Sequence, residues 1–276
     1  MDISTASPMV TRAIQFTIIV LGIVGLYYLY KYLFAASSVE IANLLSGSQP
    51  ANVDPTAPIM IPAASLVPLY EGGEFTLSMW VYVNNWSYRQ GMNKYILGIG
   101  GNTFDTIRVY LGANKTQLHV RLQTAEIGAV PGGNSSPNTA SIPITAQSVS
   151  STTNLAVSNL PQQFGTLQTD SGLLDSTEIC DLPSIDLQRW VNITIAVNGR
   201  TTDVYMDGKL ARSCVLPSFY KVDSAYKATL LNYGGFGGNL ATVNMYGTAL
   251  NPSDIYKIYA TGPVSATLMS SISSML

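Results

Sequence analysis

The sequence has 276 residues, 47% of them apolar and only 11% charged, with a formal net charge of −2 at pH 7. That length fits one large domain with short additional segments better than two domains. The fourteen Lys and Arg residues are scattered singly, which argues against nucleic acid as a partner because phosphate backbones are bound by clustered positive charge.

After a short tail over residues 1–12, an apolar run occupies residues 13–34 (AIQFTIIVLGIVGLYYLYKYLF). Its length matches the roughly 20 residues that cross a lipid bilayer, so it predicts one transmembrane α-helix and a single-pass membrane protein. The run ends in aromatic rings and a lysine that are expected to lie among the lipid headgroups as interface anchors, namely Tyr27, Tyr28, Tyr30, Lys31 and Tyr32. The alternative is a signal peptide that is cleaved just after the run, near Ala35.

The next segment, residues 35–70, is rich in Ala, Ser and Pro. Its five prolines interrupt regular elements and extend the chain, which predicts a stalk. A new composition begins at residue 71, so we expect one folded domain over residues 71–263, followed by a C-terminal tail over residues 264–276.

Alternating apolar residues in this domain predict β-strands. FTLSMWVYV places Leu77, Met79 and Val81 on one face, and IRVYLGANKTQLHVRLQ predicts two strands joined by a turn. RWVNITIAVN and TTDVYMDGKLARSC follow, with Asp207-Gly208 as a tight hairpin turn. Many short strands without amphipathic helices between them predict an all-β, antiparallel sandwich.

One helix is expected to close the domain. Asn251 is a good N-cap, Pro252 fits the first helical position, and Gly262 with Pro263 ends the pattern.

A long polar insertion is predicted over residues 127–172, where Ser, Thr, Asn, Pro and Gly dominate. Two interpretations stay open for it. Loops of this length are often functional, which makes it an interaction surface, but the same composition is typical of disordered segments.

Cys180 and Cys214 flank a predicted strand pair, so they form either a disulfide or two buried thiols. Four Asn-x-Ser/Thr triplets occur, and those at Asn114 and Asn134 lie in predicted loops. These two asparagines are candidate glycosylation sites if the domain faces a lumen.

No arrangement typical of catalysis or metal binding is found. Glycoside hydrolysis requires two closely spaced carboxylates, and no such pair occurs on one strand. His119 is the single histidine, so a histidine-based triad or zinc site lacks partners. The sequence therefore predicts a protein that is not an enzyme, with no catalytic residues, no cofactor and no metal site.

The segments FTLSMWVYV, RWVNITIAVN, DVYMDGKL and GGFGGNLATVNMYGTALNPSDIYKIYATGP resemble the concanavalin A-like lectin/glucanase (laminin-G-like) superfamily over residues 71–263. This resemblance implies an antiparallel concanavalin A-like β-sandwich of the jelly-roll type, here preceded by one transmembrane helix.

A narrower resemblance rests on WSYRQG at Trp86–Gly91 together with the N-terminal anchor. This combination is similar to proteins encoded by large double-stranded DNA viruses with an internal membrane, such as phycodnaviruses. It implies a structural minor capsid protein that links the inner virion membrane to the capsid shell, with the lipid bilayer and coat proteins as partners. The alternative is a membrane-anchored lectin that binds glycans through aromatic side chains such as those of Tyr88, Tyr220, Tyr226 and Tyr233.

Overall fold

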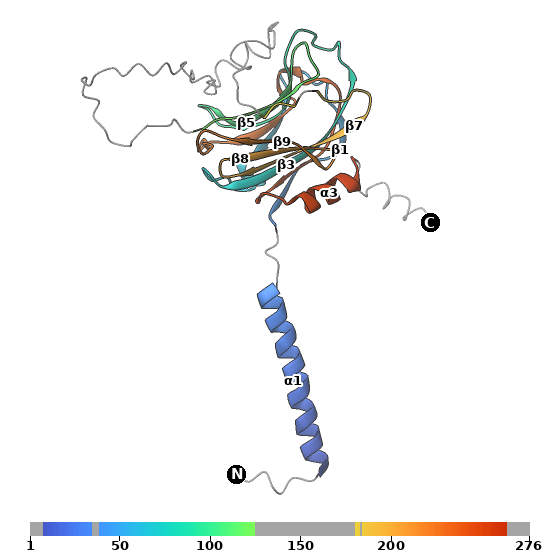
Figure 1. Cartoon of the computed structure of the whole chain (residues 1–276), viewed down its shortest axis with the longest axis vertical. Coiled ribbons are helices and arrows are strands. Elements are labelled where there is room, and N and C mark those ends of the chain that lie inside the picture. Colours follow the sequence, from blue (N-terminus) through green and yellow to red (C-terminus); the bar gives the residue numbers. More distant parts are fainter. Residues whose placement is uncertain (1–7, 35–38, 125–179, 183, 264–276) are drawn as a thin grey trace, which may run out of the picture. The chain divides into compact units, whose positions relative to one another are not determined.

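The computed structural model describes residues 8–34, 39–124, 180–182 and 184–263. The chain divides into two compact units, Met1–Val39 and Glu40–Leu276. The first contains helix α1 and the second contains a β-sandwich (Figure 1). The predicted insertion over residues 127–172 and the predicted tail over residues 264–276 lie outside the described residues.

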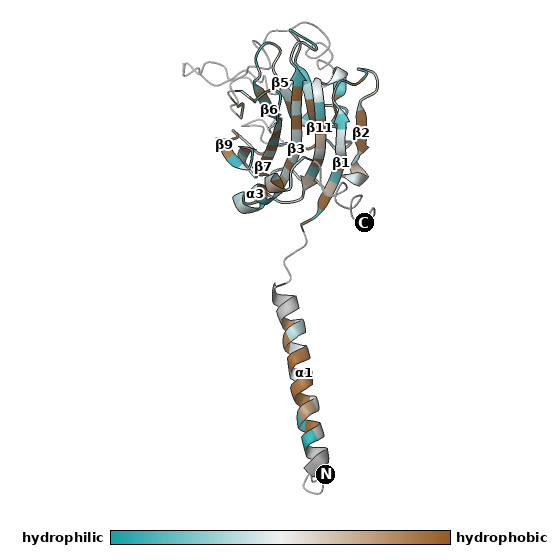
Figure 2. Ribbon diagram, turned by 90° about the vertical axis from the view of Figure 1, so that its right-hand side faces the viewer, coloured by the Kyte–Doolittle hydropathy of each residue, from teal (hydrophilic) through white to brown (hydrophobic). Residues whose placement is uncertain are grey.

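Helix α1 spans Pro8–Phe34 and includes the apolar run predicted to be helical. Its apolar residues give it a strongly hydrophobic surface (Figure 2), and the rings of Tyr27 and Tyr28 are exposed and meet edge to face at 5.7 Å. The side chains of Tyr30, Lys31 and Tyr32 are outside the described set. When only the described residues are considered, no helix combines the length of a membrane span with the mean hydropathy that such a span requires.

Two antiparallel sheets form the sandwich, which confirms the predicted all-β fold. The six-stranded sheet contains, in spatial order, β1 (Ile41–Pro50), β11 (Gly237–Tyr246), β3 (Glu74–Asn85), β7 (Trp190–Asn198), β8 (Thr201–Met206) and β9 (Lys209–Val215). The five-stranded sheet contains β2 (Ile59–Pro62), β10 (Lys227–Leu230), β4 (Lys94–Gly100), β5 (Asp105–Leu111) and β6 (Leu118–Leu122). Two short 3₁₀ helices, η2 (Ala63–Ser65) and η4 (Asn232–Gly234), lie in the connections.

The core lies between the two sheets because successive side chains of a strand point to opposite faces. Leu77, Met79 and Val81 of β3 are fully buried there, as the alternation in the sequence predicts. The predicted hairpin turn at Asp207-Gly208 joins β8 to β9, and both turn residues have positive φ angles, 52° and 72°. Two consecutive residues of this kind make the tight turn whose twist matches the flanking strands.

The prediction of an extended stalk over residues 35–70 is wrong. β1 and β2 both lie within this segment and pair with β11 and β10, so the sandwich begins at Glu40 rather than at residue 71. The prolines misled the prediction because Pro50 and Pro62 are the last residues of strands at the edges of their sheets. Proline is tolerated at such edges, where its missing N–H breaks no ladder.

Helix α3 (Pro252–Thr261) forms where the sequence predicts it, and the Asn251 side chain accepts a 3.0 Å hydrogen bond from the backbone N–H of Asp254. The helix covers part of the outer face of the six-stranded sheet. There Ile255 is fully buried, and the ring of Tyr259 stacks on that of Trp80 with centroids 5.8 Å apart. The outer face of the five-stranded sheet carries the clusters described next.

Candidate functional site

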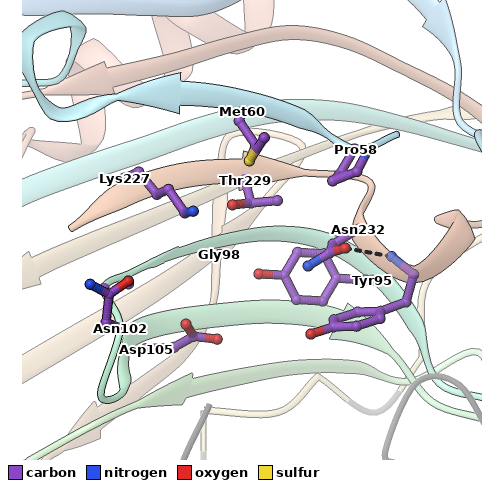
Figure 3. A pocket seen from close by; sticks show the side chains of 12 residues that line it. Pro58, Met60, Tyr95, Gly98, Asn102, Asp105, Lys227, Thr229 and Asn232 are labelled. Atoms are coloured by element: carbon purple, nitrogen blue, oxygen red, sulfur yellow. Dashed lines mark hydrogen bonds between the residues drawn. The ribbon is translucent and has the colours of Figure 1, made fainter. Parts of the chain in front are cut away.

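A hollow lies on the outer face of the five-stranded sheet, and one lysine and one threonine of β10 form part of its lining. Alternation along β10 sends Lys227 and Thr229 outward, and their cross-strand neighbours on β4 are Gly100 and Gly98. On its other side, Thr229 pairs with Met60 of β2. Because the two glycines have no side chains, the side chains of Tyr95 and Asp105 can lie close over the sheet at these positions. The two glycines form part of the lining of the hollow, whose volume is about 250 Å³ (Figure 3).

The walls of the hollow come from segments that are far apart in the sequence. They combine apolar, aromatic and polar side chains, contributed by Pro58, Met60, Tyr95, Asn102, Asp105, Asn232 and Tyr233. Asn232 and Tyr233 belong to η4, which lies in the connection between β10 and β11.

Both glycines are required by side chains that lie close to the sheet. A Cβ atom at Gly98 would come within 1.8 Å of the Tyr95 hydroxyl oxygen, and one at Gly100 would come within 2.1 Å of Asp105 Oδ1. Glycine within a strand commonly marks such a close approach. The phenol of Tyr95 and the carboxyl of Asp105 therefore line the hollow only because residues 98 and 100 are glycines.

Asp105 is paired with Arg108, whose Nε lies 2.9 Å from Oδ2. Burial raises the pKa of Asp105, and the neighbouring guanidinium of Arg108 offsets only part of this effect. Burial also raises the pKa of Tyr95 well above 10, and the charge of Asp105 adds to the effect. The phenol of Tyr95 consequently stays neutral over the whole physiological range.

Tyr233 stands in a strained backbone segment. Its φ angle is 54° and that of Leu231 is 56°, in the left-handed region that residues other than glycine rarely adopt. The Asn232 side-chain oxygen accepts a 2.8 Å hydrogen bond from the Tyr233 backbone N–H, which helps to hold this conformation. Strain of this kind costs about 1 kcal/mol or more per residue and is concentrated at functional sites, which makes the wall formed by Tyr233 a candidate for binding.

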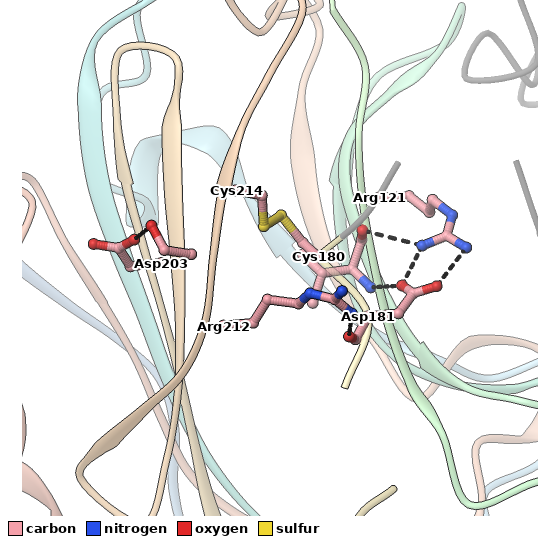
Figure 4. The surroundings of a disulfide bond; sticks show 8 residues. Arg121, Cys180, Asp181, Asp203, Arg212 and Cys214 are labelled. Carbon is pink, nitrogen blue, oxygen red and sulfur yellow. Dashed lines mark hydrogen bonds and ion pairs between the residues drawn. A yellow bond between two sulfur atoms is a disulfide. The ribbon is translucent and has the colours of Figure 1, made fainter. Parts of the chain in front are cut away.

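A separate polar cluster lies on the outer face of β6 (Figure 4). The Asp181 carboxylate contacts His119 Nδ1 at 2.9 Å, and the Arg121 guanidinium binds both carboxylate oxygens, with Nη2 2.9 Å from Oδ2. Burial by itself would raise the pKa of Asp181, but hydrogen bonds from His119 and Arg121 outweigh burial and lower it. His119 also stacks on Tyr110 with ring centroids 4.8 Å apart. His119 is consequently buried, with only 2% of its surface exposed.

The two cysteines form a disulfide beside this cluster, with Cα atoms 5.8 Å apart (Figure 4). Next to Cys180, the carbonyl oxygen of Asp181 accepts a 2.6 Å hydrogen bond from Arg212 of β9. On the other side, Leu182 N–H donates to the Leu118 carbonyl of β6 at 2.9 Å. The segment around Cys180 thus bridges β6 and β9, which are edge strands of different sheets.

Other predicted site residues are spread over the chain. Asn114 is exposed in the turn between β5 and β6, and Asn134 lies outside the described residues. Of the four tyrosines considered for glycan binding, Tyr233 lines the hollow of the five-stranded sheet, whereas Tyr220 is fully buried against Phe75. Within the described ranges, no group of three or more His, Cys, Asp or Glu side chains is placed to hold a metal ion.

Tyr95, Asp105 and Lys227 line the hollow but were not predicted from the sequence as site residues. One signal was available, because Gly98 and Gly100 interrupt an otherwise apolar strand and predict a close approach by another group. The approach of Asp105 to Gly100 could not be read from the chain, since it depends on the pairing of β4 with β5.

Comparison with known proteins gives a family match over part of the chain. Residues 134–256 match the family model described as the concanavalin A-like lectin/glucanases superfamily. No curated protein matches the sequence.

Among solved structures, the ligand-binding domain of botulinum neurotoxin serotype D in complex with N-acetylneuraminic acid is 12% identical, with a TM-score of 0.46, and the match covers 83% of this chain and 47% of that chain. The binding domain of paraclostridial mosquitocidal protein 1 is 14% identical, with a TM-score of 0.40, and the match covers 82% of this chain and 48% of that chain. The chain therefore spans about half the length of these structures.

Proposed function

We propose that this chain, which carries a sandwich of the concanavalin A-like lectin/glucanase type, is a non-enzymatic protein that binds a carbohydrate in the hollow of its five-stranded sheet. The observation that carries the proposal is the lining of the hollow, in which two tyrosines and several polar groups lie around the glycines of β4. Sites for small molecules typically combine apolar and aromatic walls with a few placed polar groups.

A sugar ring has one apolar face and a rim of hydroxyl groups, and the hollow offers partners for both. Tyr233 supplies an aromatic wall, and aromatic rings bind apolar surface while keeping a polar edge for hydrogen bonds. Among the described residues, the side chains of Asn102, Lys227 and Thr229 have no hydrogen-bond or ion-pair partner. These three groups are available to the hydroxyls of a ligand, and Lys227 also favours an acidic sugar.

We propose a non-enzymatic role because of the number of carboxyl groups in the hollow. Glycosidases use two carboxyl groups on either side of the bond that is cleaved. Of the described residues that line the hollow, Asp105 alone has a carboxyl group, and it is held by Arg108. A single carboxyl group can bind a sugar hydroxyl but cannot act as both acid and nucleophile.

We also propose that α1 anchors the sandwich to a membrane. In support, α1 is 27 residues long, and its apolar residues are distributed around the whole helix instead of forming one stripe. A helix that is apolar on all sides is typical of membrane spans or of large protein cores. The anchor would tether the chain to a membrane, and Tyr27 and Tyr28 would lie at the headgroup level.

A structural role in a virion is the second candidate, and it is favoured by the resemblance of Trp86–Gly91 and by the apolar helix. In the fold this stretch wraps around Lys94, whose ammonium lies 4.0 Å from the Trp86 ring centroid and 3.4 Å from the Arg89 carbonyl. The fold alone thus accounts for these residues. Cross-linking mass spectrometry on native membrane fractions would separate the candidates, since links from Lys115 or Lys221 to coat proteins would favour the virion role.

The carbohydrate proposal is tested with the full chain in detergent on a glycan array, followed by titration of the best glycan. Lys227→Ala and Tyr233→Ala are each expected to weaken binding about tenfold, equivalent to about 1.4 kcal/mol. Lys209→Ala and Tyr70→Ala are matched controls at exposed positions outside the hollow and should bind normally. Failure of the wild type to bind any glycan, or equal affinity of all four variants, would refute the proposal.

A further inference from the structure

A second hollow, of about 170 Å³, lies at one end of the six-stranded sheet, next to the termini of three of its strands. The register pairs Pro50 of β1 with Asn239 of β11, and Gly237 of β11 with Asn85 of β3. The ends of β1 and β3 and the start of β11 therefore surround one space. Four asparagines from these segments line it, namely Asn52, Asn84, Asn85 and Asn239.

The position of Tyr88 in this hollow is determined by the backbone around it. The Tyr88 hydroxyl donates a 3.0 Å hydrogen bond to the Gly234 carbonyl oxygen. A Cβ atom at Gly237 would come within 2.8 Å of Tyr88 Cβ and within 2.2 Å of the Asn85 carbonyl oxygen. Glycine at residue 237 is thus required for Tyr88 to pack against β11, so the aromatic wall of the hollow is preformed.

The lining has no charge, which restricts the chemistry of a ligand. Its polar side chains, within the described part of the chain, are four primary amides and one phenol. Each amide offers two donors and an acceptor. None of the four asparagine side chains is bonded to another described residue, so these groups are available to a ligand. An uncharged ligand with many hydroxyl or acetamido groups matches this set, whereas a charged ligand would find no counter-charge.

We propose that this hollow is a second binding site, specific for an uncharged sugar residue. Its volume of about 170 Å³ is small, which suits a single sugar ring better than a folded peptide segment. The ring would lie against Tyr88, and its hydroxyls would exchange hydrogen bonds with Asn84, Asn85 and Asn239. This site does not depend on the first hollow, whose lining contains Lys227 and Asp105 and is disposed toward charged sugars.

The test uses the full chain in detergent and three uncharged probes, which are cellotriose, maltotriose and N-acetylated chitotriose. Saturation-transfer NMR should detect at least one of them with the wild type. Asn84→Ala and Asn239→Ala should each weaken its binding about fivefold because each removes hydrogen bonds to the ligand. The matched control is Asn43→Ala, at an exposed position on β1 away from the hollow, which should bind like the wild type.

Two further measurements separate this site from the first hollow and from a loss of folding. Lys227→Ala should keep the affinity for the uncharged probe, and thermal unfolding should show the same midpoint for the asparagine variants as for the wild type. Binding of none of the three probes would overturn the proposal, as would binding that is insensitive to Asn84→Ala and Asn239→Ala. An N-glycan on Asn85, which begins an Asn-Trp-Ser acceptor triplet, would fill the hollow and would also overturn it.

Discussion

The disulfide between Cys180 and Cys214 gives a stability prediction whose magnitude follows from the chain itself. The two cysteines are separated by 34 positions in the sequence. In the chain-entropy account, a cross-link that closes a loop of this length restricts the unfolded chain by about 4 kcal/mol at 25 °C. Replacing both cysteines with serine should therefore destabilise the sandwich by about this amount.

The expected change in melting temperature is large enough for a routine measurement. For a domain of about 150–250 residues, 1 kcal/mol corresponds to about 2–4 °C, so the double variant should melt about 8–16 °C below the wild type. The loss should be accompanied by loosening of the bridge between β6 and β9, since Asp181 follows Cys180 directly and binds Arg212.

The assay is thermal unfolding of the full chain in detergent, followed by circular dichroism, with and without a reductant. Reduced wild type should melt like the double variant, and the reductant should not change the variant further. Ser46→Ala, at an exposed position on β1, serves as a control for the substitution itself. A shift of less than about 3 °C would refute the reasoning, because it would mean that the cross-link does not restrict the unfolded chain as the loop length requires.

Replacing Asp181 with Asn should destabilise the fold by about 3 kcal/mol near pH 7, because Arg121 and His119 would lose their buried carboxylate partner. Since the pKa of Asp181 is lowered in the folded state, its contribution is present above the unfolded pKa of about 4 and is lost as the pH falls through the folded value. Urea unfolding should show the wild type and the variant converging in acid, and a constant difference down to about pH 3 would contradict this assignment. Asn251→Ala should cost about 1 kcal/mol through loss of the N-cap of α3, and an unchanged urea midpoint would show that the cap contributes nothing.

Local sequence patterns predicted the parts of the fold that depend on near neighbours. The alternation through Leu77, Met79 and Val81 predicted β3, the Asp207-Gly208 pair predicted the β8–β9 turn, and Asn251 predicted the start of α3. Each of these features is determined by conformational preferences and burial within a few residues. The same patterns were sufficient to predict an antiparallel sandwich.

Tertiary structure decided the features that depend on which distant segments pair. The prolines of residues 35–70 indicate a stalk when they are read locally, and only pairing with β11 and β10 turns this segment into β1 and β2. The hollow of the five-stranded sheet likewise exists because the register places Thr229 opposite Gly98. Strand period is a local property of the chain, but strand pairing depends on the burial of a shared core by the whole chain, so the composition of a candidate site could not be read from the sequence alone.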